Sequence, residues 1–274
     1  MADPLRTPQE GRRPAGSSSS NRQLRRVNSE PAEPLLVLLI RLLNALLGPL
    51  THRDWRGQDN LPKSGGVVIV ANHISNVDPL ALAQYLAYSG RWPRYLAKAS
   101  LFSIPVVGRA LRAIGQIPVH RASGAAGQAV RFADEAIRRG RAVVVYPEGT
   151  ITLDPDLWPM KGRSGAVRIA LTTGCPVIPV GQWGAQDIMW GKKIHLPHLL
   201  PRKTLRLVAG PPVPLDDLRD RPATAQVLAE ATDRIMDQIT ALVAELRGES
   251  PPAERFDPRT ASSAPAGQEK EDPQ

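Results

Sequence analysis

Short β-branched runs alternate with helical segments through the middle of the chain, and this alternation is typical of an α/β fold. A chain of 274 residues is long enough for one such domain with appendages. We expect strands at residues 67–71, 142–146, 176–180 and 204–209. We expect helices at residues 79–89, directly before Gly140, at residues 165–173 and at residues 223–246. The pattern therefore predicts one α/β domain over residues 62–247.

The two ends of the chain differ in composition from this central region. Residues 1–33 combine Pro, Gly, Ser and Arg with few apolar side chains, so we expect a disordered basic arm. This arm lacks the apolar core and the small-residue cleavage site of a secretory signal peptide. Residues 248–274 are similarly polar, and we expect a disordered tail.

Composition limits the classes of site and partner. Cys175 is the only cysteine, which excludes an intrachain disulfide and metal sites built on paired cysteines. Lys and Arg number 35 against 26 Asp and Glu, and the resulting net charge of +9 favours anionic partners. An aromatic content of 4% argues against single-stranded nucleic acid, which is bound by stacking. A non-catalytic protein that binds acidic membranes is an open alternative.

A leucine-rich segment precedes the predicted domain. Residues 34–50 are fewer than the roughly 20 that a spanning helix needs, and Arg41 and Asn44 interrupt them. On a helix these two share one face, which leaves a broad apolar surface of Leu36, Leu39, Ile40, Leu43, Leu46 and Leu47. The side chains that suit the headgroup layer of an acidic bilayer are His52, Arg53, Trp55 and Arg56. We expect residues 34–61 to form a membrane-interface helical segment, and the alternative is a helix packed on its own domain.

A histidine and an aspartate follow the first expected strand. His73 and Asp78 lie five positions apart where the chain leaves the sheet, and strand exits are where α/β sites usually lie. A neutral imidazole can accept a proton from an alcohol, while a carboxylate on its other nitrogen fixes the tautomer. The pair is therefore a candidate general-base dyad. Asp78 directly precedes Pro79, so a helix N-cap is the alternative interpretation of this residue.

Two further segments contain candidate binding residues. The candidates are Lys98, Arg121, Glu148, Gly149 and Thr150. The two cations suit contact with phosphate, although both also suit a solvated surface. The glycine permits close approach of a ligand and the threonine hydroxyl can donate, although an ordinary turn explains the same residues. Residues 175–180 have the pattern of a core strand with proline at its ends.

The α/β serine hydrolases and the P-loop nucleotide-binding proteins are excluded because their motifs are absent from the sequence. No Gly-x-Ser-x-Gly sequence occurs in the chain, which excludes the nucleophile elbow of the α/β serine hydrolases. Residues 184–192 are two residues too long for a P-loop and lack the following Ser or Thr.

Together, four blocks in this order resemble the glycerolipid acyltransferases of the lysophosphatidic acid acyltransferase family, over roughly residues 67–180. Residues 72–78 resemble the His-x4-Asp motif of this family, and residues 117–121 resemble its second block. Residues 146–150 resemble its Phe-Pro-Glu-Gly-Thr block, and residues 177–180 resemble its fourth block. The family usually continues its third block with Arg, whereas this chain has Ile151, so one expected phosphate contact is missing. Either Lys161 and Arg163 supply compensating charge or the acceptor differs from lysophosphatidate.

The resemblance implies a single α/β acyltransferase domain with a mixed central sheet flanked by helices. It implies transfer of an acyl group from acyl-CoA or acyl-ACP to the free hydroxyl of lysophosphatidic acid, with no metal or other cofactor. His73 would deprotonate that hydroxyl, Asp78 would orient the imidazole, and backbone amides would stabilise the oxyanion. The residues that would bind the acceptor are Lys98, Arg121, Glu148, Gly149, Thr150 and Lys161.

The same resemblance, with the leucine-rich segment, implies a peripheral or monotopic enzyme on the cytoplasmic face of a membrane. Its role would be phospholipid biosynthesis. Other lysophospholipids, glycolipids and glycerol 3-phosphate are alternative acceptors.

Overall fold

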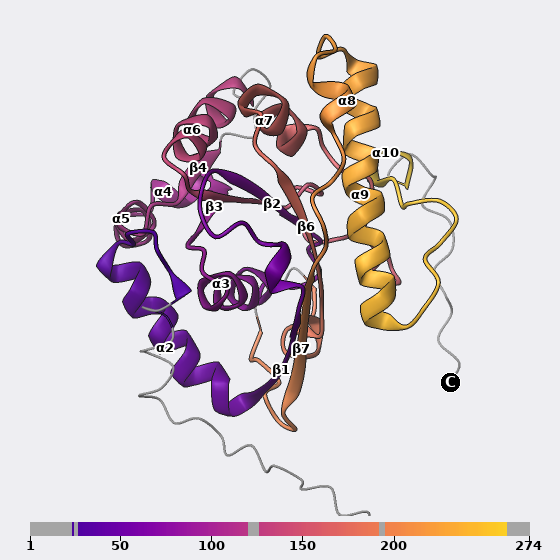
Figure 1. Cartoon of the computed structure of the whole chain (residues 1–274). Helices are drawn as coiled ribbons and strands as arrows, with labels where there is room; N and C mark the ends of the chain where they lie inside the picture. Colours follow the sequence, from indigo (N-terminus) through magenta and orange to yellow (C-terminus); the bar gives the residue numbers. More distant parts are fainter. Residues whose placement is uncertain (1–23, 25–26, 120–125, 192–194, 262–274) are drawn as a thin grey trace, which may run out of the picture.

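Seven strands form one central sheet in a computed structural model of the chain, which describes Leu24 and residues 27–119, 126–191 and 195–261 (Figure 1). The strand order across the sheet is β1-β7-β6-β2-β5-β3-β4. The strands are β1 (Thr51–Arg56), β2 (Val67–Ala71), β3 (Pro93–Lys98), β4 (Ile117–Val119), β5 (Ala142–Val145), β6 (Val177–Trp183) and β7 (Lys203–Ala209). All neighbours pair in parallel except β6 and β7, which are antiparallel. The predicted α/β fold with a mixed central sheet is confirmed.

Helices cover both faces of the sheet. They are α2 (Pro34–Leu50), α3 (Asp78–Tyr88), α4 (Ala99–Phe102), α5 (Pro105–Ala113), α6 (Ala126–Arg138), α7 (Gly165–Thr173), α8 (Asp216–Arg219), α9 (Ala225–Arg247) and α10 (Pro258–Ala261). The predicted strands and longer helices have nearly the bounds that the sequence pattern indicates. The pattern did not predict β1, β3 and β4 or the short helices beside them, because these segments lack a clear apolar period.

Alternate strand residues face two separate cores. Val68 and Val70 of β2 pack in the cluster that contains buried residues of α6, α7 and α9. Val67 and Ile69 pack on the opposite face, in the cluster that contains residues of α3. Figure 1 shows α9 on one side of β6 and β7 and α3 on the other. The chain therefore encloses β2 between two helical layers, as expected for a strand that is apolar at every position.

Helix α2 lies outside α3 and divides its leucines between two environments. Leu36 and Ile40 pack against Ala87 of α3. Four other leucines of the helix are exposed, namely Leu38, Leu39, Leu42 and Leu46. One face of this helix therefore packs on the domain, as the alternative interpretation expects, and the opposite face is exposed. No helix in the described ranges is both long and apolar enough to cross a bilayer.

The segment after α2 corrects a prediction. Residues 51–56, expected in a membrane-interface helical segment, form strand β1 at the sheet edge, where Trp55 lies opposite Leu207 of β7. Trp55, expected in the headgroup layer, makes an edge-to-face contact with Tyr85 of α3 at a ring-centroid distance of 5.8 Å. An edge strand has only one neighbour, so its polar residues give little strand signal. The sheet begins before residue 62, where we expected the domain to begin.

Part of the expected disordered arm is folded against the domain. Asn28 donates a hydrogen bond to the carbonyl of Ala87 at 2.7 Å, and the Trp92 indole donates to the carbonyl of Glu30 at 3.2 Å. Disorder is therefore not found at residues 27–33. Residues 1–23 and 25–26 lie outside the described residues.

The expected C-terminal tail is also folded over residues 248–261. The Lys161 amide donates to the carbonyl of Phe256 at 2.9 Å, and the Lys161 ammonium lies 3.2 Å from a carboxylate oxygen of Asp257. Just before this segment, the guanidinium carbon of Arg247 lies 4.0 Å from the ring centroid of Trp158. These contacts join residues far apart in sequence, which a local pattern does not reveal. Residues 262–274 lie outside the described residues.

A buried arginine joins the amino-terminal ends of two central strands. Arg91 is fully buried and donates to the carbonyls of Pro62, Gly65 and Gly140 at 2.6, 2.6 and 2.9 Å. Its guanidinium also lies 2.8 Å from a carboxylate oxygen of Glu30. Pro62 and Gly65 precede β2 and Gly140 precedes β5, so one side chain fixes both strand entries.

Replacing this arginine should destabilise the fold. Because Arg91→Ala would leave three carbonyls and Glu30 without their donor, we expect the free energy of unfolding to fall by about 3–5 kcal/mol. Urea unfolding checks this. The matched control is Arg139→Ala, which removes an exposed pair with Glu135 and should cost under about 0.5 kcal/mol. Equal losses in the two variants would contradict the assignment.

Candidate active site

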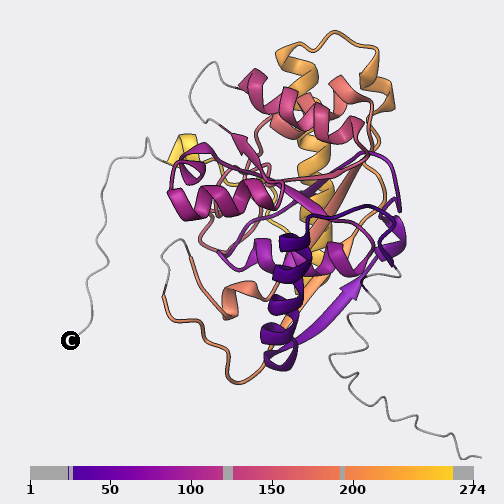
Figure 2. The ribbon, with the colours of Figure 1, turned by 90° about the vertical axis from the view of Figure 1, so that its left-hand side faces the viewer.

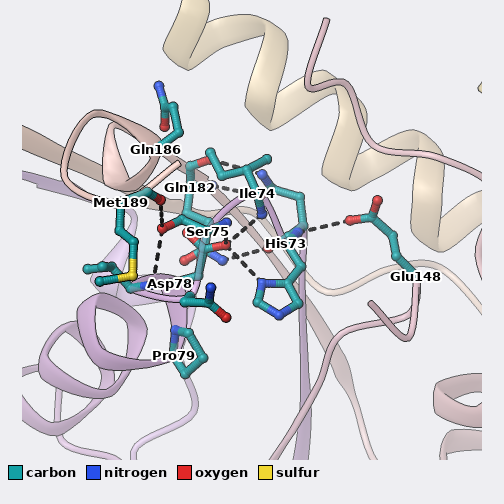
Figure 3. Close-up of polar contacts among 12 residues, drawn as sticks. His73, Ile74, Ser75, Asp78, Pro79, Glu148, Gln182, Gln186 and Met189 are labelled. Carbon is teal, nitrogen blue, oxygen red and sulfur yellow. Dashed lines mark hydrogen bonds and ion pairs between the residues drawn. The ribbon is translucent and has the colours of Figure 1, made fainter. Parts of the chain in front are cut away.

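Two neighbouring parallel strands bring the candidate residues together at their carboxyl ends. In the register of β2 and β5, Val70 lies opposite Val145. His73 therefore follows β2 at the same edge of the sheet where Tyr146 follows β5. Figure 3 shows the polar contacts around His73 at this edge, where sites in α/β sheets usually lie.

The histidine and the aspartate form the predicted dyad. The His73 Nδ1 atom lies 2.9 Å from Asp78 Oδ2. Asp78 is fully buried, whereas the His73 side chain is 16% exposed. Since Nδ1 faces the carboxylate, Nε2 is the ring nitrogen left for a substrate.

The Asp78 carboxylate does not cap helix α3. Its Oδ2 atom accepts from the backbone amides of Ile74 and Ser75 at 2.6 and 2.7 Å, which precede the helix. The N-cap position is Val77, which makes no side-chain cap. Burial raises the Asp78 pKa, and the His73 hydrogen bond and both amides oppose that rise. The alternative interpretation of Asp78 as an N-cap is therefore wrong.

An aromatic ring fixes the other side of the imidazole. The Tyr146 ring stacks on His73 with a centroid distance of 4.3 Å and an interplanar angle of 21°. Tyr95 lies beyond Tyr146 at 6.2 Å, nearly parallel to it. Burial raises the pKa of both phenols well above the usual value, so the rings stay uncharged beside the dyad. Beyond its place in the third block, no role was predicted for Tyr146.

The Glu148 side chain holds the loop after β2 through a backbone amide of that loop. Its Oε1 accepts from the His73 amide at 2.9 Å and its Oε2 accepts from the Met160 amide at 3.1 Å. The side chain is 2% exposed, and burial raises its pKa to about 8. We expected Glu148 to bind the acceptor. Its oxygens instead face the protein, which makes it a positioning residue.

Further polar contacts, which sequence reasoning missed, brace the loop after β2. The Asn72 side chain donates to the carbonyl of Gln182 at 3.0 Å and accepts from the Gln182 amide at 2.9 Å. Ser75 Oγ donates to the carbonyl of Met189 at 2.6 Å and accepts from the Val77 amide at 3.1 Å. Gln182 and Met189 each lie more than a hundred residues from their partners, so no local pattern signals these two contacts.

The amides next to His73 are already occupied. The amides of His73, Ile74 and Ser75 donate to the two buried carboxyl groups. They are therefore not the donors that the expected oxyanion stabilisation requires, and any such amides lie elsewhere.

The other predicted site residues lie at different distances from this centre. Gly149 has a φ of +74° and Thr150 is half-buried, and both follow Glu148 directly. Lys98 is exposed at the carboxyl end of β3. Lys161 pairs with Asp257 rather than projecting freely. Arg121 lies outside the described residues.

Within the described ranges, no three His, Cys, Asp or Glu side chains come together in a way that could hold a metal ion.

Comparison with known proteins decides the family. A family model described as Acyltransferase matches residues 52–183. A 1-acyl-sn-glycerol-3-phosphate acyltransferase of Brassica napus is 34% identical over 143 residues, which are 52% of this chain and 40% of that protein. One from Borreliella burgdorferi is 38% identical over 127 residues, which are 45% of this chain and 48% of that protein. Residues 52–183 of this chain thus match the acyltransferase family.

The acyltransferase match includes β1 at one end and all of β6 at the other. The family resemblance predicted from the sequence is confirmed. The chain spans 40% and 48% of the length of the two relatives. A solved structure, the 1-acyl-sn-glycerophosphate acyltransferase of Thermotoga maritima, has the same fold. It matches with a TM-score of 0.58 at 22% identity, over 79% of this chain and 81% of that one.

Buried Glu148 should give this acyltransferase domain a distinctive pH dependence. Its pKa of about 8 in the fold lies above the ordinary 4.5, so the unfolded chain releases the proton first. Stability from this group is therefore complete below pH about 4.5 and is lost as pH rises to about 8. Glu148→Gln cannot ionise, so we expect wild type to lose thermal stability relative to this variant over that range.

Thermal unfolding of both proteins between pH 5 and 8.5 measures the difference. A loss of stability that does not depend on pH lowers the unfolding temperature of the variant equally at every pH. The readout is therefore the change with pH in the difference between the two unfolding temperatures. A difference in unfolding temperature that stays constant across this pH range would contradict the raised pKa of Glu148.

Proposed function

We propose that this chain transfers a fatty acyl group from an acyl thioester to the free hydroxyl of lysophosphatidic acid, which yields phosphatidic acid. The donor would be acyl-CoA or acyl-ACP. The names of the relatives support this substrate class. The observation that supports it most directly is the 2.9 Å contact between His73 Nδ1 and the buried Asp78, because it leaves Nε2 as a base.

In this proposal His73 removes the proton of the acceptor hydroxyl. The imidazole is partly exposed, so a hydroxyl can approach Nε2. The Asp78 carboxylate stabilises the imidazolium that forms, and the stacked Tyr146 ring keeps the imidazole in one orientation. Glu148 fixes the His73 backbone.

The transfer needs no nucleophile from the protein. The hydroxyl oxygen attacks the thioester carbonyl carbon, which forms the new C–O bond and a tetrahedral oxyanion. Collapse of this intermediate breaks the C–S bond, and the departing thiolate takes the proton from His73 Nε2. Because a thioester is already activated, positioning and base catalysis account for the reaction.

Cationic side chains would bind the acceptor phosphate. Lys98 is exposed. It lies three residues after Tyr95, the last residue of β3 that pairs with β5, and at the same sheet edge as Tyr146. Arg121 would be the second cation that binds the phosphate, because of its position in the second block of the family motifs. The reaction would serve phospholipid biosynthesis on the cytoplasmic face of a membrane.

The test of this function is thiol release from palmitoyl-CoA by purified protein in detergent, with and without lysophosphatidate. We expect acceptor-dependent release. Because His73→Ala removes the base, turnover should fall by about 10²–10⁴-fold. The matched control is His198→Ala, an exposed histidine that should keep full turnover.

Three outcomes are informative. Release by wild type and His198→Ala but not by His73→Ala supports the proposal. Release that needs a different lysolipid or glycerol 3-phosphate corrects the acceptor. No release with any acyl-CoA, acyl-ACP or acceptor contradicts acyl transfer and favours a non-catalytic membrane-binding protein.

We also propose that the exposed leucine face of α2 docks on an acidic bilayer. Figure 2 shows α2, in indigo, toward the viewer. Apolar side chains are also exposed in the loop between β6 and β7, where Trp190 is 68% exposed and Leu196 is 85% exposed. Arg202 joins this loop to the end of α2 and the start of β1 by donating to the carbonyls of Gly48 and Thr51 at 3.4 and 2.9 Å.

The same loop also touches the dyad loop. The Asn76 side chain donates to the carbonyl of Gly191 at 3.2 Å, one residue after the exposed indole. A bilayer in contact with Trp190 and α2 would therefore lie close to the loop that contains His73. The net charge of +9 favours an acidic surface.

Vesicle sedimentation tests this docking. We expect Leu42→Asp with Leu46→Asp to weaken binding to phosphatidylglycerol-containing vesicles at least tenfold, because two charges would enter the apolar layer. Both leucines are exposed, so the fold should be unaffected. The control is Phe132→Asp on α6, on the other face of the sheet. Equal binding by the leucine variant and wild type would contradict docking by α2.

A further inference from the structure

An exposed arginine lies against the glycine of the third block. The Arg163 amide donates to the carbonyl of Pro147 at 2.9 Å, which brings the loop before α7 onto residues 146–150. A Cβ atom at Gly149 would lie 3.1 Å from Arg163 Nε and 3.5 Å from its guanidinium carbon. Gly149 therefore allows the guanidinium to rest against the backbone of this turn, and its positive φ also favours glycine.

The Arg163 side chain is available to a ligand. It is exposed, and among the described residues its guanidinium makes no hydrogen bond or ion pair. The neighbouring cation Lys161 differs, because it pairs with Asp257 at 3.2 Å. The Thr150 hydroxyl, next to Gly149, likewise has no partner in the described part of the chain.

The turn places these two groups next to the catalytic histidine. Tyr146 at its start stacks on His73, and Glu148 in its middle accepts from the His73 amide. Gly149 and Thr150 follow at once. In lysophosphatidic acid the phosphate and the free hydroxyl lie on neighbouring glycerol carbons, so an anion site must lie close to the base.

We propose that Arg163 binds the phosphate of the acceptor lipid, with the Thr150 hydroxyl as a second donor. This inference rests on the proposed function for the identity of the acceptor. A guanidinium binds phosphate through two parallel N–H groups, which suits a phosphomonoester better than an uncharged lipid. Ile151 is buried, so the position at which the family usually has Arg contributes no charge here. Of the two compensating cations suggested by the sequence, the geometry favours Arg163 over Lys161.

The role of Arg163 predicts a selective loss of acceptor affinity. Equilibrium binding of lysophosphatidate and of monoacylglycerol in detergent micelles is measured in a His73→Ala background, which removes turnover. We expect Arg163→Gln to raise the Kd for lysophosphatidate at least tenfold and to leave that for monoacylglycerol unchanged. Arg163→Lys keeps the charge but not the paired N–H groups, so its Kd should lie between the two.

The matched control is Arg168→Gln, another exposed arginine without a partner among the described residues, one turn into α7. It should bind both lipids as wild type does. Inorganic phosphate distinguishes a headgroup site from a free-phosphate site. Competition by phosphate at millimolar concentration, lost in Arg163→Gln, supports the same anion site, whereas phosphate binding without a change in the lysophosphatidate Kd overturns the lipid assignment.

The result also separates this inference from the proposed reaction. An equal lysophosphatidate Kd for wild type and Arg163→Gln overturns the role of Arg163 even where thiol release shows acyl transfer. An Arg163-dependent Kd without thiol release by wild type supports the binding role and contradicts acyl transfer. An equal loss in Arg163→Gln and Arg168→Gln would show only a general effect of charge and would overturn the site.

Discussion

One buried carboxylate oxygen organises the loop at the carboxyl end of β2. Asp78 Oδ2 accepts from Ile74, Ser75 and the His73 imidazole, all within 2.9 Å. A buried carboxylate needs such donors, because burial without them costs several kcal/mol. The loop after β2 must therefore wrap around this atom, and the wrapping decides which imidazole nitrogen faces outward. The orientation of the His73 imidazole and the start of α3 both depend on the Asp78 carboxylate.

A second buried carboxyl group holds that loop from the opposite side. Glu148 joins the His73 amide to the Met160 amide, so the loops after β2 and β5 become one unit. Asp78 acts on the imidazole and Glu148 acts on the backbone of the same residue. The two acidic residues thus have different roles, since Asp78 contacts the His73 imidazole and Glu148 contacts only backbone amides.

The dyad could be predicted because it depends on local sequence. A five-residue spacing after a β-branched run places His73 and Asp78 on one loop, and the structure confirms their contact. Whether Asp78 faces its own helix or the histidine could not be decided, because an Asp-Pro pair suits both. Strand β1 and residues 248–261 were missed for another reason. Their order comes from partners far along the chain, such as β7 and Lys161, which no local period contains.

The folded C-terminal segment supports the loop that precedes α7. Arg247 lies between Trp158 and Trp183, and Phe256 and Asp257 hold Lys161 by its backbone and its side chain. The loop that leads to Arg163 is therefore held by the C-terminal segment. Because Met160, directly before Lys161, donates to the same Glu148 carboxyl group as the His73 amide, substitutions in the C-terminal segment can displace the His73 loop as well as Arg163.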